Sequence, residues 1–186
     1  LTPTDAKEVL VNAPTGVLDG ATVKVFPGPN NSAIVAWLAT DRQVWYTDGI
    51  NADALSRDRI TTELRDYIGD RLAVNADQDF TAVMNFADHQ YVLDCGNGRQ
   101  YCYDYIRKSW TRYRGWPSGY YAAAKDTAGQ DILIGVDRDS ARIFQANVGL
   151  DDNGFDIAPY WKTPHIHCNS PTVEKVWHEV YVAWRT

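Results

Sequence analysis

The chain has 186 residues, of which 45% are hydrophobic, and a formal net charge of −6. This length suits one domain with a real core or, at most, two small ones. The acidic balance argues against a general nucleic-acid binder, which needs clustered Lys and Arg to displace counterions from phosphates. Seven Trp and eleven Tyr against one Met favour strands, in which aromatic residues are enriched.

Neither a membrane span nor a leader is expected. The longest apolar run, Ala33 to Ala39, is far shorter than the roughly 20 residues that a spanning helix requires. Leu1 to Asp5 have neither the basic region nor the apolar core of a signal peptide. The chain begins with Leu rather than Met, which is typical of a fragment or a trimmed product.

The cysteines indicate a reducing compartment at the time of folding. Cys95 and Cys102 flank Gly96-Asn97-Gly98, and a two-residue type I′ turn at Asn97-Gly98 would place Cys95 opposite Gln100 and Cys102 opposite Leu93. A four-residue loop would instead pair the two thiols. A disulfide is therefore not favoured, and we expect reduced thiols in a cytosolic setting.

In chain order, residues 1–22 form a docking or linker segment, with a short helix over 5–12. A brief extended stretch at 23–26 ends in Pro- and Gly-rich loop residues. Strands follow at 32–38 and 43–47. Residues 57–68 then predict the one helix, with Ser56 as N-cap and Gly69 at the C′ position.

The second half of the chain predicts strands only. Four strands at 80–86, 90–95, 99–105 and 108–113 make one four-stranded unit. The next unit comprises 119–125, 131–136, 141–146 and, after a loop, about 158–163. An alternating strand over 173–184 follows Pro171 and would close or extend the same domain.

A weak internal repeat connects these units. Gln90 to Asp94 returns 41 positions later as Asp131 to Gly135, and an earlier copy begins at Gln43. Short strands that repeat at this spacing are typical of propeller blades. We therefore predict an all-β, propeller-like domain over 23–170, with four-stranded antiparallel blades, one short inserted helix, and 171–186 as its last strand. The sequence predicts two complete blades and one partial blade. The domain is therefore expected to be a closed propeller, a fragment of one or a half-ring.

The motifs that carry chemistry are weak. No nucleophile elbow or phosphate loop is present. His165, His167 and Cys168 could approach a metal from one strand. Structural zinc sites, however, usually have four protein ligands at closer sequence spacing. The run Asp151 to Asp156 does not match the register of a calcium loop. We expect no catalytic residue, no metal and no cofactor, and hence no enzyme.

Exposed aromatic residues are the remaining candidates for function. Trp110 is expected to pack between sheets. A candidate interaction surface, suited to protein contacts or to stacking on sugars, comprises Trp116, Tyr120, Tyr121 and Trp161. The local basic cluster is expected to be a solvated blade edge and comprises Arg107, Lys108, Arg112 and Arg114.

The strand order resembles a known family. An Ala-rich strand is followed by Tyr91-Val92-Leu93-Asp94, by Tyr101 to Asp104 and by Trp110 to Tyr113, and later by Gly149 to Gly154 and Tyr160 to Thr163. Over about residues 32–184, this order resembles that of the β-propeller tail proteins, of nozzle or neck type, of short-tailed bacteriophages. The proteins of that family are several times longer than this chain.

The resemblance implies a structural role in the virion, at the DNA exit path or the host surface, after assembly in the host cytoplasm. Its implied partners are other tail proteins, further copies of the chain or the rest of a longer chain. Negative walls in a channel would repel phosphates, so tight nucleic-acid binding is not expected. The alternative function is a carbohydrate-binding propeller module. A glycosidase is a third hypothesis and rests on fold analogy alone.

Overall fold

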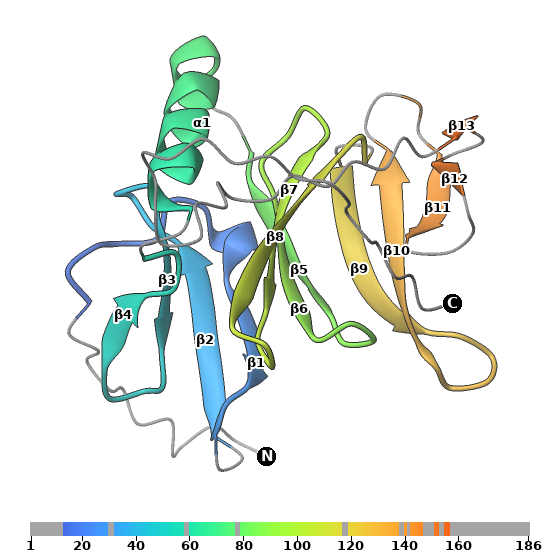
Figure 1. The fold of residues 1–186 in the computed structure, drawn as a ribbon, viewed down its shortest axis with the longest axis horizontal. Helices are drawn as coiled ribbons and strands as arrows, with labels where there is room; N and C mark the ends of the chain where they lie inside the picture. The colour runs from blue at the N-terminus through green and yellow to red at the C-terminus, as the bar shows by residue number, and fades with distance from the viewer. Residues whose placement is uncertain are drawn as a thin grey trace, which may run out of the picture.

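The computed structural model describes residues 13–29, 32–57, 60–76, 79–116, 119–137, 140, 142–146, 151–152 and 155–156, the last two pairs as backbone only. Over these residues the protein is mostly β, with antiparallel sheets and one helix (Figure 1). The first sheet contains, in spatial order, β1 (Lys24–Pro27), β2 (Ala33–Leu38), β3 (Val44–Thr47) and β4 (Ala52–Ala54). The 3-10 turn η1 (Gly20–Thr22) leads into it.

Two further sheets and a short ribbon follow along the chain. The second sheet contains β5 (Thr81–Asn85), β6 (Gln90–Asp94), β7 (Arg99–Asp104) and β8 (Ser109–Arg114). The third contains β9 (Gly119–Lys125), β10 (Asp131–Asp137) and β11 (Ile143–Ala146), and the ribbon β12 (Asp151–Asp152) and β13 (Phe155–Asp156). Every pairing is antiparallel between chain neighbours, so each sheet is a meander.

The strand predictions agree closely with the observed strands, with one correction at the first sheet. That unit is a complete four-stranded sheet rather than a partial one, because β1 pairs with β2 and the short β4 pairs with β3. Ala52-Asp53-Ala54 has no β-branched or aromatic residue, so composition alone does not mark it as a strand.

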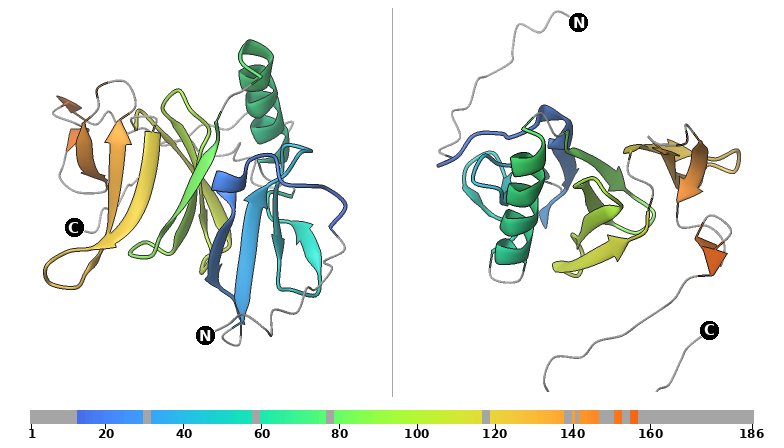
Figure 2. Two further views of the ribbon diagram at one scale, coloured as in Figure 1. Left: turned by 180° about the vertical axis from the view of Figure 1, so that it is seen from behind. Right: turned by 90° about the horizontal axis from the view of Figure 1, so that it is seen from above.

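The first strands of the three sheets lie side by side. β1 contacts β5, and β5 contacts β9, while the later strands of each sheet extend away from this line. Figures 1 and 2 show the sheets following one another in chain order, with the second sheet between the other two. No described sheet closes on itself, so the arrangement is an arc of sheets and not a closed barrel.

A large apolar core fills the space between the first and second sheets. From the first sheet it takes Phe26, Ile34, Ala36, Leu38 and Val44, and from the second Ala82, Met84, Tyr91, Leu93, Tyr101 and Tyr103. Trp110 on β8 packs against this core, and its indole N–H donates to the Leu55 carbonyl at 3.2 Å. The expectation that Trp110 packs between sheets is confirmed.

A smaller, aromatic-rich core joins the second and third sheets. Its buried residues are Val83, Val92, Cys102, Leu133 and Ala146, and its half-buried residues are Tyr113, Trp116, Tyr121 and Phe144. Gly135 makes room for one of these rings, because a Cβ at this position would lie 2.8 Å from Phe144 Cε1. The two cores lie on opposite faces of the second sheet.

Two aspartates connect one sheet to the first strand of the next. Asp19 Oδ2 accepts the Phe80 backbone N–H at 3.0 Å, just before β5, while its Oδ1 accepts from Ala21 at 2.8 Å. In the same way Asp94 Oδ2 accepts the Gly119 N–H at 3.0 Å, at the start of β9. Each carboxylate thereby fixes where the following sheet begins.

The helix α1 (Thr61–Val74) is displaced from the predicted range of 57–68. Ser56 is not its N-cap: the Ser56 hydroxyl accepts the Val44 N–H at 3.2 Å, and the helix begins after Ile60. Gly69 does not end the helix but sits inside it, where the Arg42 guanidinium packs against its bare Cα. Leu64 and Ile68 of the helix are fully buried in the first core.

The β6–β7 hairpin differs by one position from its predicted register. Cys95 N–H donates to the Arg99 carbonyl at 3.0 Å, and Gly96, Asn97 and Gly98 all adopt positive φ, so the loop has three residues. This shift places Cys102 opposite Val92 instead of Leu93. Cys95 and Cys102 are both buried and free, and they face different cores.

Several predictions lie outside the described residues. These are the helix over 5–12, the strands over 158–163 and 173–184, Trp161, and the histidines and cysteine at 165–168. The proposed division into 1–22, 23–170 and 171–186 also stays a prediction.

Candidate interaction surface

One face of the third sheet points away from the second sheet and is apolar. The register pairs Tyr120 with Val136 and Ala122 with Ile134, and β10 pairs Val136 with Ile143, so these side chains share one face. The exposed fractions of Tyr120, Val136 and Ile143 are 55%, 39% and 76%. We call this the trailing face, defined by Tyr120, Ala122, Ile134, Val136 and Ile143.

The opposite end of the arc carries a second apolar face. The register places Val25 opposite Val35, and Trp37 opposite Trp45, on the side of the first sheet that faces away from the core. Val25 is 53% exposed, whereas Trp37 is only 6% exposed and its indole N–H has no hydrogen-bond partner. We call this the leading face, defined by Val25, Val35, Trp37 and Trp45.

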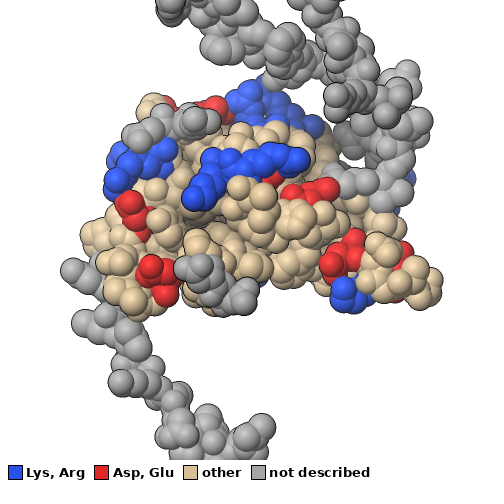
Figure 3. Space-filling model, turned by 60° about the horizontal axis from the view of Figure 1, so that its bottom comes forward, with Lys and Arg blue, Asp and Glu red and all other residues tan. Residues whose placement is uncertain are grey.

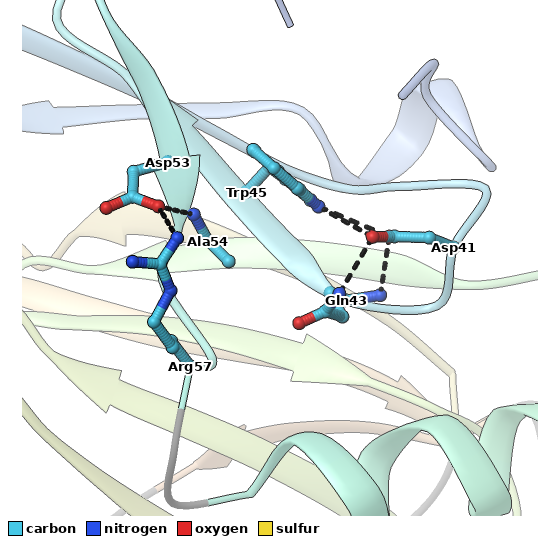
Figure 4. A network of polar contacts seen from close by, with 6 residues as sticks. All are labelled: Asp41, Gln43, Trp45, Asp53, Ala54 and Arg57. Carbon is cyan, nitrogen blue, oxygen red and sulfur yellow. Dashed lines mark hydrogen bonds and ion pairs between the residues drawn. The ribbon is translucent and has the colours of Figure 1, made fainter. Parts of the chain in front are cut away.

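Polar contacts hold Trp45 in place at the leading face. Figure 4 shows Asp41, in the β2–β3 turn, aimed at the Trp45 indole, whose N–H donates to both carboxylate oxygens at 3.1 and 3.2 Å. The same carboxylate accepts the backbone and side-chain N–H groups of Gln43. Nearby, Asp53 on β4 forms an ion pair with Arg57. The Asp41 carboxylate thus fixes the orientation of the indole ring.

Of the four aromatic residues predicted as an interaction surface, the three that the structure describes do not share one face. Trp116 stacks on Tyr113 with ring centroids 4.9 Å apart and contacts Tyr121 at 5.9 Å, so both belong to the second core. Tyr120 lies on the trailing face, and Trp161 is outside the described residues. Adjacent strand residues point to opposite faces, and this is the signal that separates Tyr120 from Tyr121.

The sequence patterns did not predict the trailing and leading faces. Ile132, Leu133 and Ile134 form a continuous apolar run in β10. Such a run predicts a strand with both faces covered, but it does not show which elements cover them. Only the register with β9 and β11 shows that one of these faces lacks a described neighbour.

The predicted basic cluster follows the outermost strand of the second sheet. Arg107 pairs with Asp104 at 2.7 Å and is 79% exposed, and Arg112 forms an ion pair with Glu63 of α1. Arg99 lies over the Tyr67 ring of the helix at 4.0 Å. Figure 3 shows Lys and Arg side chains gathered together on one face of the molecule. Arg107 agrees with the expected solvated edge, whereas Arg112 is 31% exposed and is held against α1.

A shallow polar cleft of about 410 Å³ lies beside the β5–β6 and β7–β8 turns. It is lined by Ala87, Asp88, His89, Gln90, Arg107 and Tyr113. Asp104 fixes one wall, because its carboxylate accepts the backbone N–H groups of Ile106 and Arg107, and the Arg107 contact lowers the Asp104 pKa. The Gln90 side-chain oxygen is buried and has no partner. The cleft is therefore lined by a carboxylate, Asp88, and a guanidinium, Arg107, whereas the Gln90 oxygen is not accessible from it.

Within the described residues, no group of three or more His, Cys, Asp and Glu side chains could hold a metal ion. Burial raises the pKa of the Cys95 thiol well above its ordinary value and also raises that of Cys102, so both stay protonated and are poor nucleophiles. In this part of the chain, no helix has the length and apolar character needed to cross a membrane.

Comparisons of the chain with protein-family models, with curated proteins and with solved structures gave no match.

Proposed function

We propose that this chain is a non-enzymatic structural protein of a bacteriophage virion, a tail or neck component built on propeller-like blades. The observation that carries the proposal is the arc of three meander sheets whose first strands lie side by side. In a propeller each blade is such a meander, and the first strands line the central axis. The order of aromatic and apolar strands that resembles phage tail propellers supports the same assignment.

The surface chemistry supports a role in assembly. Exposed apolar residues on the trailing face, together with Val25 of the leading face, suit contacts with other virion proteins or with further blades. Buried, protonated thiols and carboxylates engaged in hydrogen bonds favour a scaffold over a catalyst. The net charge of −6 is compatible with a location along the DNA exit path, where weak phosphate binding is an advantage.

The test is whether the chain is incorporated into particles. Phage particles made in cells that express the chain would be purified by density gradient, and the chain quantified by mass spectrometry with gold-labelled antibody in electron microscopy. We expect a fixed copy number per particle and label at the tail or neck. Absence from intact particles, or label restricted to soluble fractions, would contradict the proposal.

The polar cleft favours a second candidate function, carbohydrate binding. A sugar hydroxyl could donate to the Asp88 carboxylate, while Arg107 donates to a neighbouring hydroxyl. Screening on a glycan array would test this candidate with Arg107→Ala, and with Arg57→Ala as a control at another exposed ion pair. Specific binding that only Arg107→Ala removes would support the cleft. Binding lost on Tyr120→Ala would locate it on the trailing face, and no binding would exclude this candidate.

A further inference from the structure

Two arginines lie directly opposite each other on the face of the second sheet that carries the first core. β7 pairs Arg99 with Arg114 of β8. At the adjoining position the Gly115 N–H donates to the Gly98 carbonyl at 2.9 Å, so the arginines form a non-hydrogen-bonded pair. In such a pair the two side chains lie closer together than in a hydrogen-bonded one. Like charges directly opposite each other destabilise a sheet, and this pair therefore calls for a negative charge between its guanidinium groups.

A third arginine on the same face already has its carboxylate. Arg112 forms an ion pair with Glu63 of α1, whose carboxylate also accepts the Tyr101 hydroxyl at 3.2 Å. Among the residues that the structure describes, no carboxylate forms an ion pair with Arg99 or Arg114. Three guanidinium groups and one carboxylate leave an excess of two positive charges at this place, in a chain whose net charge is −6.

An aromatic side chain of the helix holds Arg99 in position. The guanidinium carbon lies 4.0 Å from the centroid of the Tyr67 ring, and the Tyr67 hydroxyl donates to the Gly96 carbonyl at 2.9 Å. The ring face attracts the cation electrostatically, so this contact needs no carboxylate. Arg99 is half-buried and Arg114 is exposed. The pair thus combines one positioned guanidinium with one that can adjust to a ligand.

We infer that Arg99 and Arg114 form a binding site for a phosphate group that carries two negative charges, either free phosphate or the end group of a phosphate monoester. A guanidinium presents its N–H donors in a planar fork that fits pairs of phosphate oxygens. A phosphate monoester has a charge of about −1.5 to −2 near neutral pH and three strong acceptor oxygens, so one group can neutralise both arginines. A carboxylate, with one charge and two oxygens, would satisfy only one of them.

The charge of the ligand separates this site from a nucleic-acid interface. Each phosphodiester of a nucleic-acid backbone carries one negative charge and would leave the pair half neutralised. The acidic balance of the whole chain likewise argues against a general nucleic-acid binder. The inference goes beyond the proposed structural role and does not depend on it.

Isothermal titration calorimetry at low ionic strength and about pH 7.5 tests the site with inorganic phosphate, methyl phosphate and dimethyl phosphate. We expect inorganic phosphate to bind, and dimethyl phosphate, which has one charge, to bind at least about tenfold more weakly. Equal affinity for methyl phosphate would identify a monoester end group as the ligand, and weaker affinity would identify free phosphate. No binding of inorganic phosphate to the wild-type chain would overturn the inference.

Variants place the binding at the arginine pair. Arg114→Gln should raise the dissociation constant for phosphate at least about tenfold. Arg57→Gln is the matched control, because Arg57 lies in an exposed ion pair with Asp53 in the first part of the chain, and it should bind as the wild type does. Equal losses in the two variants would contradict the proposed site. Tighter binding of a DNA oligonucleotide than of inorganic phosphate, at equal phosphate concentration, would replace it with a nucleic-acid interface.

Thermal unfolding gives a second and independent measurement. Without phosphate, Arg114→Gln should unfold at a higher temperature than the wild type, because one of two opposed charges is gone. Saturating phosphate should raise the Tm of the wild type but not that of the variant, beyond the effect of potassium chloride at the same ionic strength. A wild type that is the more stable without phosphate and does not respond to it would show that the pair is neutralised within the chain, and would overturn the inference. Incorporation into virions is measured separately and would be unaffected.

Discussion

At the residue scale, the second core depends on a missing side chain. Gly135 of β10 faces this core, and its φ is not in the left-handed region, so its role is to provide space rather than backbone freedom. Phe144 lies over it and meets Tyr121 edge to face, with ring centroids 6.0 Å apart. The glycine therefore determines how closely the third sheet can pack against the second.

Replacing Gly135 by Ala should destabilise the protein by about 1–3 kcal/mol, because the added methyl forces the Phe144 ring out of its packed position. Urea unfolding followed by circular dichroism would measure the change. Gly16→Ala is the control, since a Cβ at Gly16 meets no atom within 4 Å. Equal unfolding midpoints for the two variants would show that the ring moves aside without cost.

At the element scale, the prediction of strands from sequence succeeded and the prediction of caps did not. Alternation and β-branched content identify most strands within one or two residues. Ser56 and Gly69 have the chemistry of helix caps, but tertiary contacts use them otherwise: Ser56 accepts a bond from β3, and Gly69 accommodates Arg42. The predicted register of the hairpin at Asn97 was also wrong. One Asn-Gly pair predicts a two-residue turn, whereas three consecutive residues adopt positive φ.

The candidate surfaces depended on information that a sequence does not contain. Tyr120 and Tyr121 are chemically alike and adjacent, yet one is exposed on the trailing face and the other packs against Trp116. Strand alternation separates them, but only the sheet order shows which of the two faces is covered. The burial of the Gln90 side-chain oxygen likewise results from tertiary packing and could not be predicted from the residue type.

Asp94 connects its own hairpin to the start of the third sheet. Asp94 is only 5% exposed. Its carboxylate accepts hydrogen bonds from the Gly96 backbone N–H, from the Gln100 side-chain amide and, across the sheet junction, from the Gly119 backbone N–H. Asp94→Ala should cost about 2–4 kcal/mol, because it leaves buried donors without an acceptor. Asp126→Ala is a matched control, since Asp126 accepts two backbone N–H groups within one exposed turn. Thermal unfolding of both variants checks this, and a similar loss in each would contradict the role assigned to Asp94.

At the scale of the whole molecule, tyrosines buried between sheets predict sensitivity to alkali. Burial raises the pKa of Tyr101 from 10.0 to about 12, and burial also raises the pKa of Tyr91, whose hydroxyl donates to the Thr22 carbonyl. A raised pKa means that the folded chain keeps a proton which the unfolded chain releases. Stability is therefore complete below the ordinary tyrosine pKa and is lost as the pH rises towards the folded value.

Urea midpoints measured from about pH 8 to about pH 12 should be constant at first and then fall once the pH exceeds about 10. Tyr91→Phe is an informative variant, since it removes one titrating group and should make the fall less steep. A midpoint that stays constant throughout this range would contradict the burial of these hydroxyls.

An arc of separate sheets leaves outer strands whose backbone groups lack a described neighbour, and β8 is one of these. Such edges invite pairing with other chains and, through it, aggregation. Arg112 and Arg114 lie along this strand, and Arg107 and Lys108 form the turn that leads into it. Arg107 and Arg112 are in ion pairs with Asp104 and Glu63, so Lys108 and Arg114 are the members of the cluster that would set like charges against a second β8. The basic cluster thus has a consequence for solubility: it opposes edge-to-edge pairing at β8.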